Sequence, residues 1–147
     1  MLRPMTSSST RTSTEIQPHR NAHPEYLRLR DAVASKHGRP VSTAELAEAL
    51  SLSIRHFARL TREEPTPILG FALRQIAKVG LGRAGEITPA EALQMWDELI
   101  VSRQHAGRLL GVRGSKVASR LRENPKPALM LAIAWLHGRL SVAALEA

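Results

Sequence analysis

Apolar side chains recur along the chain at the three- and four-residue spacing of amphipathic helices. No window alternates apolar and polar residues well enough to indicate a strand, so the sequence predicts an all-α fold. Four helices are expected between residues 24 and 80, and their inward positions are Tyr26, Leu29 and Val33; Leu46 and Leu50; Ile54, Phe57 and Ala58; and Leu69, Ala72, Leu73 and Ile76. Four more are expected between residues 88 and 141, and their inward positions are Ala92, Leu93, Trp96, Leu99 and Ile100; Ala106, Leu109 and Leu110; Val117 and Leu121; and Leu129, Ala132, Ile133 and Leu136.

Helix-start signals agree with this pattern. Ser42–Glu45 and Thr88–Glu91 have the form of capping boxes, with a hydroxyl residue at the N-cap and Glu three residues later. Ser102 is expected to cap the helix that follows it. Proline is favoured in the first helical turn, which predicts helix starts at three prolines: Pro24, Pro67 and Pro127.

The chain also resembles itself. Residues 41–81 align without a gap on residues 101–141, sixty positions later, with ten identical pairs that include both members of a Pro-x-Pro sequence. This register predicts two copies of one supersecondary unit. The expected organisation is two units of four to five helices joined by a short Gly-rich linker: residues 1–22 a disordered basic tail, 23–80 the first unit, 81–87 the linker and 88–147 the second unit.

Length and composition restrict the classes of protein. Two units of about 55 residues would each be marginally stable alone, so they are expected to pack on each other or on a second chain. Aromatic residues make up only 3% of the 147 residues, which leaves Leu, Ala, Ile and Val to form the core. No apolar run approaches the length of a membrane span, and there is no cysteine, so a cytoplasmic protein without membrane association is expected.

Charge is distributed unevenly along the chain. The formal net charge of +8 divides into +4 for residues 1–40, −2 for residues 41–100 and +6 for residues 101–147. A basic field concentrated in one small unit indicates either a polyanionic partner, usually nucleic acid, or a solvated surface.

Each unit contains two short helices joined by a tight turn, with a small residue where the helices are expected to cross. Ala47 and Gly107 occupy this equivalent position, where a large side chain would prevent the close approach that a helix-turn-helix needs. The two stretches are Ser42–Phe57 and Ser102–Val117.

Both stretches resemble the helix-turn-helix of lambda-repressor-like (Cro/CI-type, XRE) domains of phage and plasmid regulators. The second resembles the family at the turn, through Leu110-Gly111-Val112 and Val117, and the first along its leading helix, Ala44–Ala47. The Pro-x-Pro and the Ala/Leu-rich helix after it are also similar to family members. The chain departs from the pattern at Ser51, where a turn glycine is usual, and at Arg103, where glutamine is frequent.

The resemblance implies that the second helix of each pair lies in the DNA major groove with its early residues at base edges. The candidate DNA-binding residues of the second unit are Arg113, Ser115, Lys116, Ser119 and Arg120, with Arg103 near the phosphates. Those of the first unit are Ser53, Arg55, His56 and Arg59. Arg62 and Arg122, which recur in the repeat, are interpreted as ion-pairing or capping residues at a helix end.

The expected function is that of a sequence-specific transcriptional regulator, a repressor by the resemblance, that binds double-stranded DNA as a homodimer or through two fused units. Two alternatives stay open: a protein-interaction module that sequesters another regulator, and an accessory protein of plasmid or phage DNA processing. Neither an enzyme, a cofactor, a metal site nor a small-molecule ligand is expected. Gly80–Gly85 matches GxGxxG, but a helix rather than a strand precedes it, so it is not interpreted as a dinucleotide site.

Overall fold

The computed structural model describes residues 22–99 and 103–146, and within the last helix it describes side chains as far as Leu140. This part of the chain is all-helical and contains no strand, as expected from the sequence. Its nine helices are α1 (Pro24–His37), α2 (Thr43–Ala49), α3 (Ile54–Leu60), α4 (Pro67–Val79), α5 (Leu81–Ala84), α6 (Pro89–Glu98), α7 (Arg103–Leu110), α8 (Gly114–Glu123) and α9 (Pro127–Glu146).

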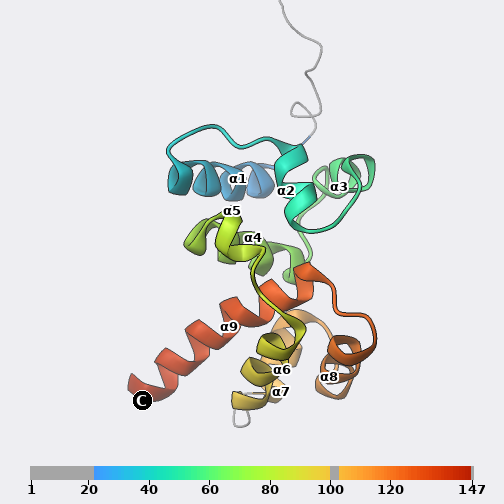
Figure 1. Ribbon diagram of the computed structural model, residues 1–147, viewed down its shortest axis with the longest axis vertical. Coiled ribbons are helices and arrows are strands. Elements are labelled where there is room, and N and C mark those ends of the chain that lie inside the picture. Colours follow the sequence, from blue (N-terminus) through green and yellow to red (C-terminus); the bar gives the residue numbers. More distant parts are fainter. Residues whose placement is uncertain (1–21, 100–102, 147) are drawn as a thin grey trace, which may run out of the picture.

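The helices form two groups along the longest axis of the molecule (Figure 1). Helices α1 to α5 make the upper group in that view, and α6 to α9 make the lower one. The most extensive contact between any two helices joins α4 of the first group to α9 of the second. Within the groups α1 packs on α4, and α6 packs on both α8 and α9.

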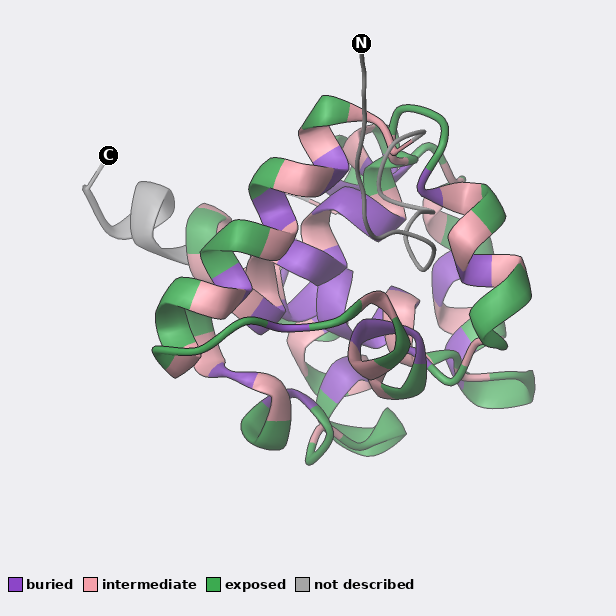
Figure 2. Ribbon diagram, turned by 90° about the horizontal axis from the view of Figure 1, so that it is seen from above, coloured by how far each residue is buried: buried purple, intermediate pink, exposed green. Residues whose placement is uncertain are grey.

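Each group encloses a hydrophobic cluster. The first is formed mainly by α1 to α4 around Phe57, whose ring meets that of Tyr26 edge to face at a centroid distance of 5.7 Å. The second is formed mainly by helices α6 to α9 around Trp96, which is 1% exposed. Buried residues occupy the inward sides of the helices in both groups (Figure 2). Aliphatic side chains, together with Tyr26, Phe57 and Trp96, therefore make up most of the core, as the low aromatic content predicted.

Helix starts recur at the sixty-residue offset found in the sequence. Helices α2, α3 and α4 begin at residues 43, 54 and 67, and α7, α8 and α9 begin at residues 103, 114 and 127. All ten buried residues between 43 and 79 have a buried counterpart sixty positions later. These pairs are Leu46/Ala106, Ala47/Gly107, Leu50/Leu110, Phe57/Val117, Thr61/Leu121, Leu69/Leu129, Gly70/Met130, Ala72/Ala132, Leu73/Ile133 and Ile76/Leu136.

Most of the helix-start signals are confirmed. Both capping boxes form, with the Ser42 and Thr88 hydroxyls accepting from the backbone N–H of Glu45 and Glu91 at 3.1 Å. Proline opens α1, α4, α6 and α9. The predicted cap at Ser102 and the predicted tail at residues 1–21 lie outside the described residues.

The predicted linker at residues 81–87 is wrong in part, because its first four residues form helix α5. Gly80, with φ 93°, ends α4 and starts α5 directly. The imidazole Nε2 of His37 accepts a hydrogen bond from the Leu81 N–H at 2.9 Å, and Ala84 is buried in the first cluster. Leu140, at the position equivalent to Gly80, lies inside α9, so that helix continues to Glu146.

The turn between α2 and α3 contains a serine in the conformation that glycine adopts in the turn between α7 and α8. Ser51 has φ 56° and is the one described non-glycine residue with positive φ, while Gly111 at the equivalent position has φ 74°. A left-handed conformation costs an L-residue roughly 1–2 kcal/mol and costs glycine almost nothing. The serine is therefore held there by its surroundings rather than by its own preference.

We expect Ser51→Gly to raise the free energy of unfolding by about 0.5–1 kcal/mol, because relief of the strained φ exceeds the extra unfolded-state entropy of glycine. Gly111→Ala should lower it by about 1 kcal/mol, and since no atom lies within 4 Å of the added Cβ, that change reports backbone conformation alone. Urea denaturation followed by circular dichroism measures both. A destabilising Ser51→Gly would contradict the assigned turn.

Candidate nucleic-acid interface

Two helix pairs, α2 with α3 and α7 with α8, are joined by turns of the same type. In the first, the Leu52 N–H donates to the Ala47 carbonyl at 2.9 Å and the Ser51 N–H donates to the Glu48 carbonyl at 3.0 Å. In the second, the N–H groups of Val112 and Gly111 donate to the carbonyls of Gly107 and Arg108 at 3.0 and 3.1 Å. This paired pattern is the Schellman helix ending, so both turns redirect the chain in the same way.

Small residues lie at both helix crossings, as expected from the sequence. Ala47 and Gly107 are both buried. A Cβ added to Gly107 would lie 2.8 Å from the Val112 carbonyl oxygen and 3.2 Å from the Gly114 nitrogen. These atoms belong to the backbone and cannot rotate away, so the second turn requires glycine at this position.

Helix α8 is buried on one side and basic on the other. Val117 and Leu121 face the second cluster with 0% and 2% exposure. Four of the five residues predicted to read DNA from this helix are exposed, and the fifth, Ser119, is half-buried. The exposed residues are Arg113, Ser115, Lys116 and Arg120. None of the three cations among them forms an ion pair with a described residue, so their charges are available to a partner.

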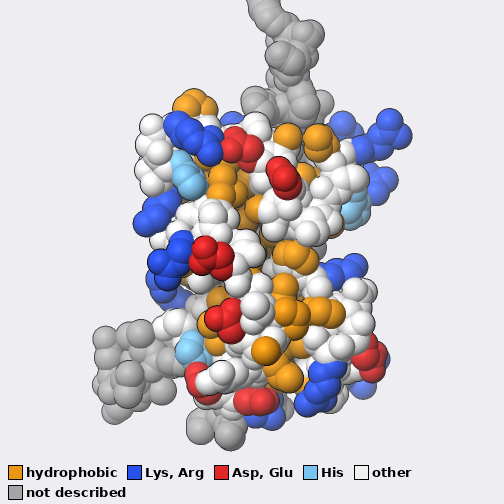
Figure 3. Space-filling model, in the orientation of Figure 1, with side chains coloured by type: hydrophobic (Ala, Val, Ile, Leu, Met, Phe, Trp, Pro, Cys, Tyr) orange, Lys and Arg blue, Asp and Glu red, His pale blue; other side chains and the backbone are white. Residues whose placement is uncertain are grey.

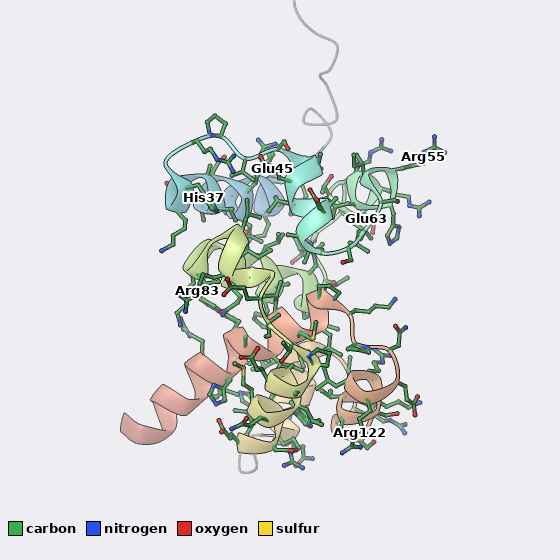
Figure 4. All side chains as sticks on the ribbon, in the orientation of Figure 1. His37, Glu45, Arg55, Glu63, Arg83 and Arg122 are labelled. Atoms are coloured by element: carbon green, nitrogen blue, oxygen red, sulfur yellow. The ribbon has the colours of Figure 1, made fainter. Side chains whose placement is uncertain are left out.

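Helix α3 presents a different outer surface. Arg55 and Arg59 are exposed, and Arg59 donates to Nδ1 of the half-buried His56 at 3.1 Å. Arg55 points away from the body of the protein (Figure 4). Ile54 is 60% exposed and is the one large hydrophobic residue left exposed in the described part of the chain. An exposed isoleucine at the first position of such a helix is available for apolar contact with a partner.

Two predicted site residues have local structural roles. The Ser53 hydroxyl accepts from the His56 N–H at 3.1 Å and caps α3. The Arg103 side chain folds back toward α6, where its Nη2 donates to the Asp97 carbonyl at 3.4 Å. Its Nε is buried without a hydrogen-bond partner among the described atoms. Arg103 is therefore half-buried rather than presented as an exposed phosphate contact.

The interpretation of Arg62 and Arg122 as ion-pairing or capping residues at a helix end is wrong for the described part of the chain. Both side chains are exposed, and neither forms an ion pair or hydrogen bond with a described residue. Arg122 lies near the end of α8 and adds to the positive charge there (Figure 4).

Lys126 was not among the residues predicted from the sequence to contact DNA. It is exposed immediately before α9 and lines a cavity of about 370 Å³. The other lining residues are Ile68, Arg120, Asn124, Ala128 and Leu129. The signal was present in the repeat, because Lys126 replaces Thr66 between the two prolines and belongs to the positively charged half of the alignment.

The two motifs differ strongly in charge. Residues 103–126 contain seven Lys or Arg residues and one acidic residue. Residues 43–66 contain three Arg residues and four acidic residues. Lys and Arg side chains lie along the edge of the molecule that carries α3 above and α8 below (Figure 3). Residues 103–126 therefore carry a net positive charge, whereas residues 43–66 do not.

An ion pair fixes the start of the leading helix α2. The Glu45 carboxylate accepts from Arg39 Nη2 at 2.9 Å and from the Ser42 N–H at 3.1 Å (Glu45 is labelled in Figure 4). The hydrogen bond from Arg39, and after it the one from the Ser42 backbone, lowers the pKa of Glu45 from 4.5 to about 2. The carboxylate therefore stays ionised through most of the acid range and keeps the cap in place.

Comparison with protein-family models, with curated proteins and with solved structures finds no match to this chain. Within the part of the chain that the structure describes, no three His, Asp or Glu side chains are grouped closely enough to hold a metal ion. No described helix is both long and apolar enough to cross a membrane. The surface geometry and its charge are thus the observations on which a function can be proposed.

We expect Glu45→Gln to destabilise the protein at neutral pH, because glutamine keeps the cap geometry and loses the ion pair. The folded-state pKa is depressed, so the carboxylate's contribution is complete above pH 4.5 and is lost as the pH falls towards 2. Urea denaturation of both proteins between pH 7 and pH 3 should show a difference that shrinks below about pH 4.5.

Arg39→Met provides the control for this effect, because it removes the partner and leaves the carboxylate. At pH 7 it should lower the free energy of unfolding as Glu45→Gln does. Its difference from the wild type should likewise shrink as the pH falls. A stability difference for Glu45→Gln that is constant over the whole range would contradict the assigned ion pair.

Proposed function

We propose that this chain is a sequence-specific double-stranded DNA-binding protein that regulates transcription. The observation that carries the proposal is the outer face of α8, where Arg113, Lys116 and Arg120 are exposed and unpaired among the described residues. Arginine and lysine at these positions can donate to guanine O6 and N7 or to phosphate. The preceding turn and the buried inner face of α8 hold these side chains on a rigid element.

We also propose that the chain contains two copies of one helix-turn-helix unit. The shared helix starts, the ten buried pairs and the matching left-handed turn residues support common descent. The buried positions match, whereas the outer positions of α3 and α8 differ in charge and size. This is the pattern expected when a scaffold is retained and two binding surfaces diverge.

Fluorescence anisotropy with a labelled mixed-sequence duplex of about 40 base pairs tests DNA binding. If about six phosphates are contacted, the affinity should fall about 10³-fold between 50 and 200 mM salt. The triple variant R113A/K116A/R120A should bind at least 10-fold more weakly at 50 mM salt and should show a shallower salt dependence.

A matched control removes three exposed cations that lie outside α3 and α8. The variant K36A/K78A/R83A has the same net charge as the α8 variant, and its changes lie on α1, α4 and α5. It should bind within about 3-fold of the wild type, since these cations lie outside the proposed contact. Affinity that is flat with salt, or equal losses in both variants, would contradict the proposal. Regulation that survives in an α8 variant unable to bind DNA would favour the protein-interaction alternative.

A further inference from the structure

Helices α4 and α9 meet through residues that are equivalent in the repeat. Ile68 and Ala128, sixty positions apart near the starts of the two helices, line the same cavity. Farther along, the Nζ of Lys78 lies 3.3 Å from the point that a Cβ on Gly138 would occupy. The two helices therefore run in the same direction, and equivalent positions approach each other at both of these points.

The two clusters exchange side chains reciprocally across this contact. Ala128 and Leu131 of α9 pack on the first cluster. Ile68 and Phe71 of α4, at the equivalent positions, pack on the second. Repeats stacked by translation join two different surfaces, as in a solenoid. Reciprocal contact between identical surfaces is instead the property of a two-fold axis.

This approximate two-fold axis runs between α4 and α9 and leaves the molecule where both helices begin. Helices α3 and α8 directly precede α4 and α9, and both lie on that same side of the molecule (Figure 1). The two candidate recognition helices are therefore related by a half-turn and flank the axis. Two-fold-related helix-turn-helix units read half-sites of opposite orientation on duplex DNA.

The outer faces of the two helices are chemically unlike. Helix α3 begins with the exposed Ile54, followed by Arg55, whereas α8 begins with Gly114 and carries Lys116. An exposed aliphatic side chain is suited to the thymine 5-methyl group, and lysine and arginine are suited to guanine. Both helices carry arginine, so the difference rests on Ile54: the half-site under α3 is expected to contain a thymine that the half-site under α8 does not need.

We propose, resting on the DNA-binding function above, that one chain binds one duplex as a built-in dimer. It reads two unlike half-sites in inverted orientation, a thymine-containing one under α3 and a guanine-containing one under α8. The homodimer expected from the sequence is replaced by the second unit of the same chain.

The test begins with selection of sites by the full chain from a duplex library with 40 random base pairs. The expected product is one bipartite site with two different halves related by inversion. Native mass spectrometry of the complex on this site should show one chain per duplex. Hydroxyl-radical footprinting should show Lys116→Ala weakening protection of the guanine half and Arg55→Ala weakening protection of the other.

Replacing thymine by uracil in the α3 half removes only the methyl group. Wild-type protein should bind this duplex about 4-fold more weakly, which corresponds to one buried methyl group. Ile54→Ala should bind both duplexes equally, and uracil in the α8 half should change nothing. A general weakening of binding in Ile54→Ala would lower its affinity for both duplexes and keep their ratio. Loss of the preference for thymine over uracil in this variant therefore points to contact between Ile54 and the methyl group.

Failure of this inference and failure of DNA binding are distinguishable. Three results would overturn the built-in dimer while leaving the protein a DNA-binding one. They are two chains bound to a palindrome, selection of a direct repeat, and a footprint confined to one half of the site. An α3 half without thymine, or a uracil effect that persists in Ile54→Ala, would overturn the role of Ile54. Failure to enrich any sequence would overturn the proposed function itself.

Discussion

The packing of α4 against α9 is the contact on which the rest of the structure depends. Each helix contributes residues to its own cluster and to the neighbouring one, so neither cluster is complete alone. Units of about 55 residues bury too little surface to be more than marginally stable. Each additional buried Leu or Ile contributes about 2 kcal/mol, which makes shared residues such as Leu131 significant at this size. The same contact sets where α3 and α8 lie, so stability and the arrangement of the candidate interface have one cause.

Backbone constraints fix the geometry of both helix pairs, α2–α3 and α7–α8. The Schellman bonds and left-handed residues at 51 and 111 impose the turn, and Ala47 and Gly107 permit the crossing. None of these features involves the outer face of α3 or α8. The outer faces of α3 and α8 can therefore differ in charge without any change to the turns or the helix crossings.

Much of this fold could be predicted because its signals are local. Pro67 and Pro127 open helices because their fixed φ suits the first turn. Both predicted capping boxes also form. The ends of helices were less predictable: α5 was missed because Gly80 suggests a linker, although its φ of 93° directly starts another helix. The sixty-residue register was visible in the sequence. The helix surfaces that meet could not be predicted from it, because an apolar helix such as α9 has no single hydrophobic side.

The candidate site was predictable in its positions and less so in its details. Helical spacing was enough to place Lys116 and Arg120 on an outer face. It could not show that Arg103 folds back onto the Asp97 carbonyl or that Ser53 is used as a cap, because both depend on a neighbouring chain segment or a local backbone geometry. Lys126 was not among the predicted residues because it lies outside the helix pair, and only the structure shows that it lines a cavity with Arg120 and Ile68.

The central claim is that the α4–α9 contact holds the two helix groups as one rigid body, and the distance between the α2–α3 and α7–α8 helix pairs tests it most directly. The chain has no cysteine, so Glu63→Cys and Glu123→Cys, equivalent exposed positions just beyond α3 and at the end of α8, can be spin-labelled selectively. Pulsed electron paramagnetic resonance should give one narrow distance distribution that is unchanged when duplex DNA is added. Small polar interfaces between domains allow relative motion. A broad distribution in the free protein, or a distance that shifts on binding DNA, would contradict the account.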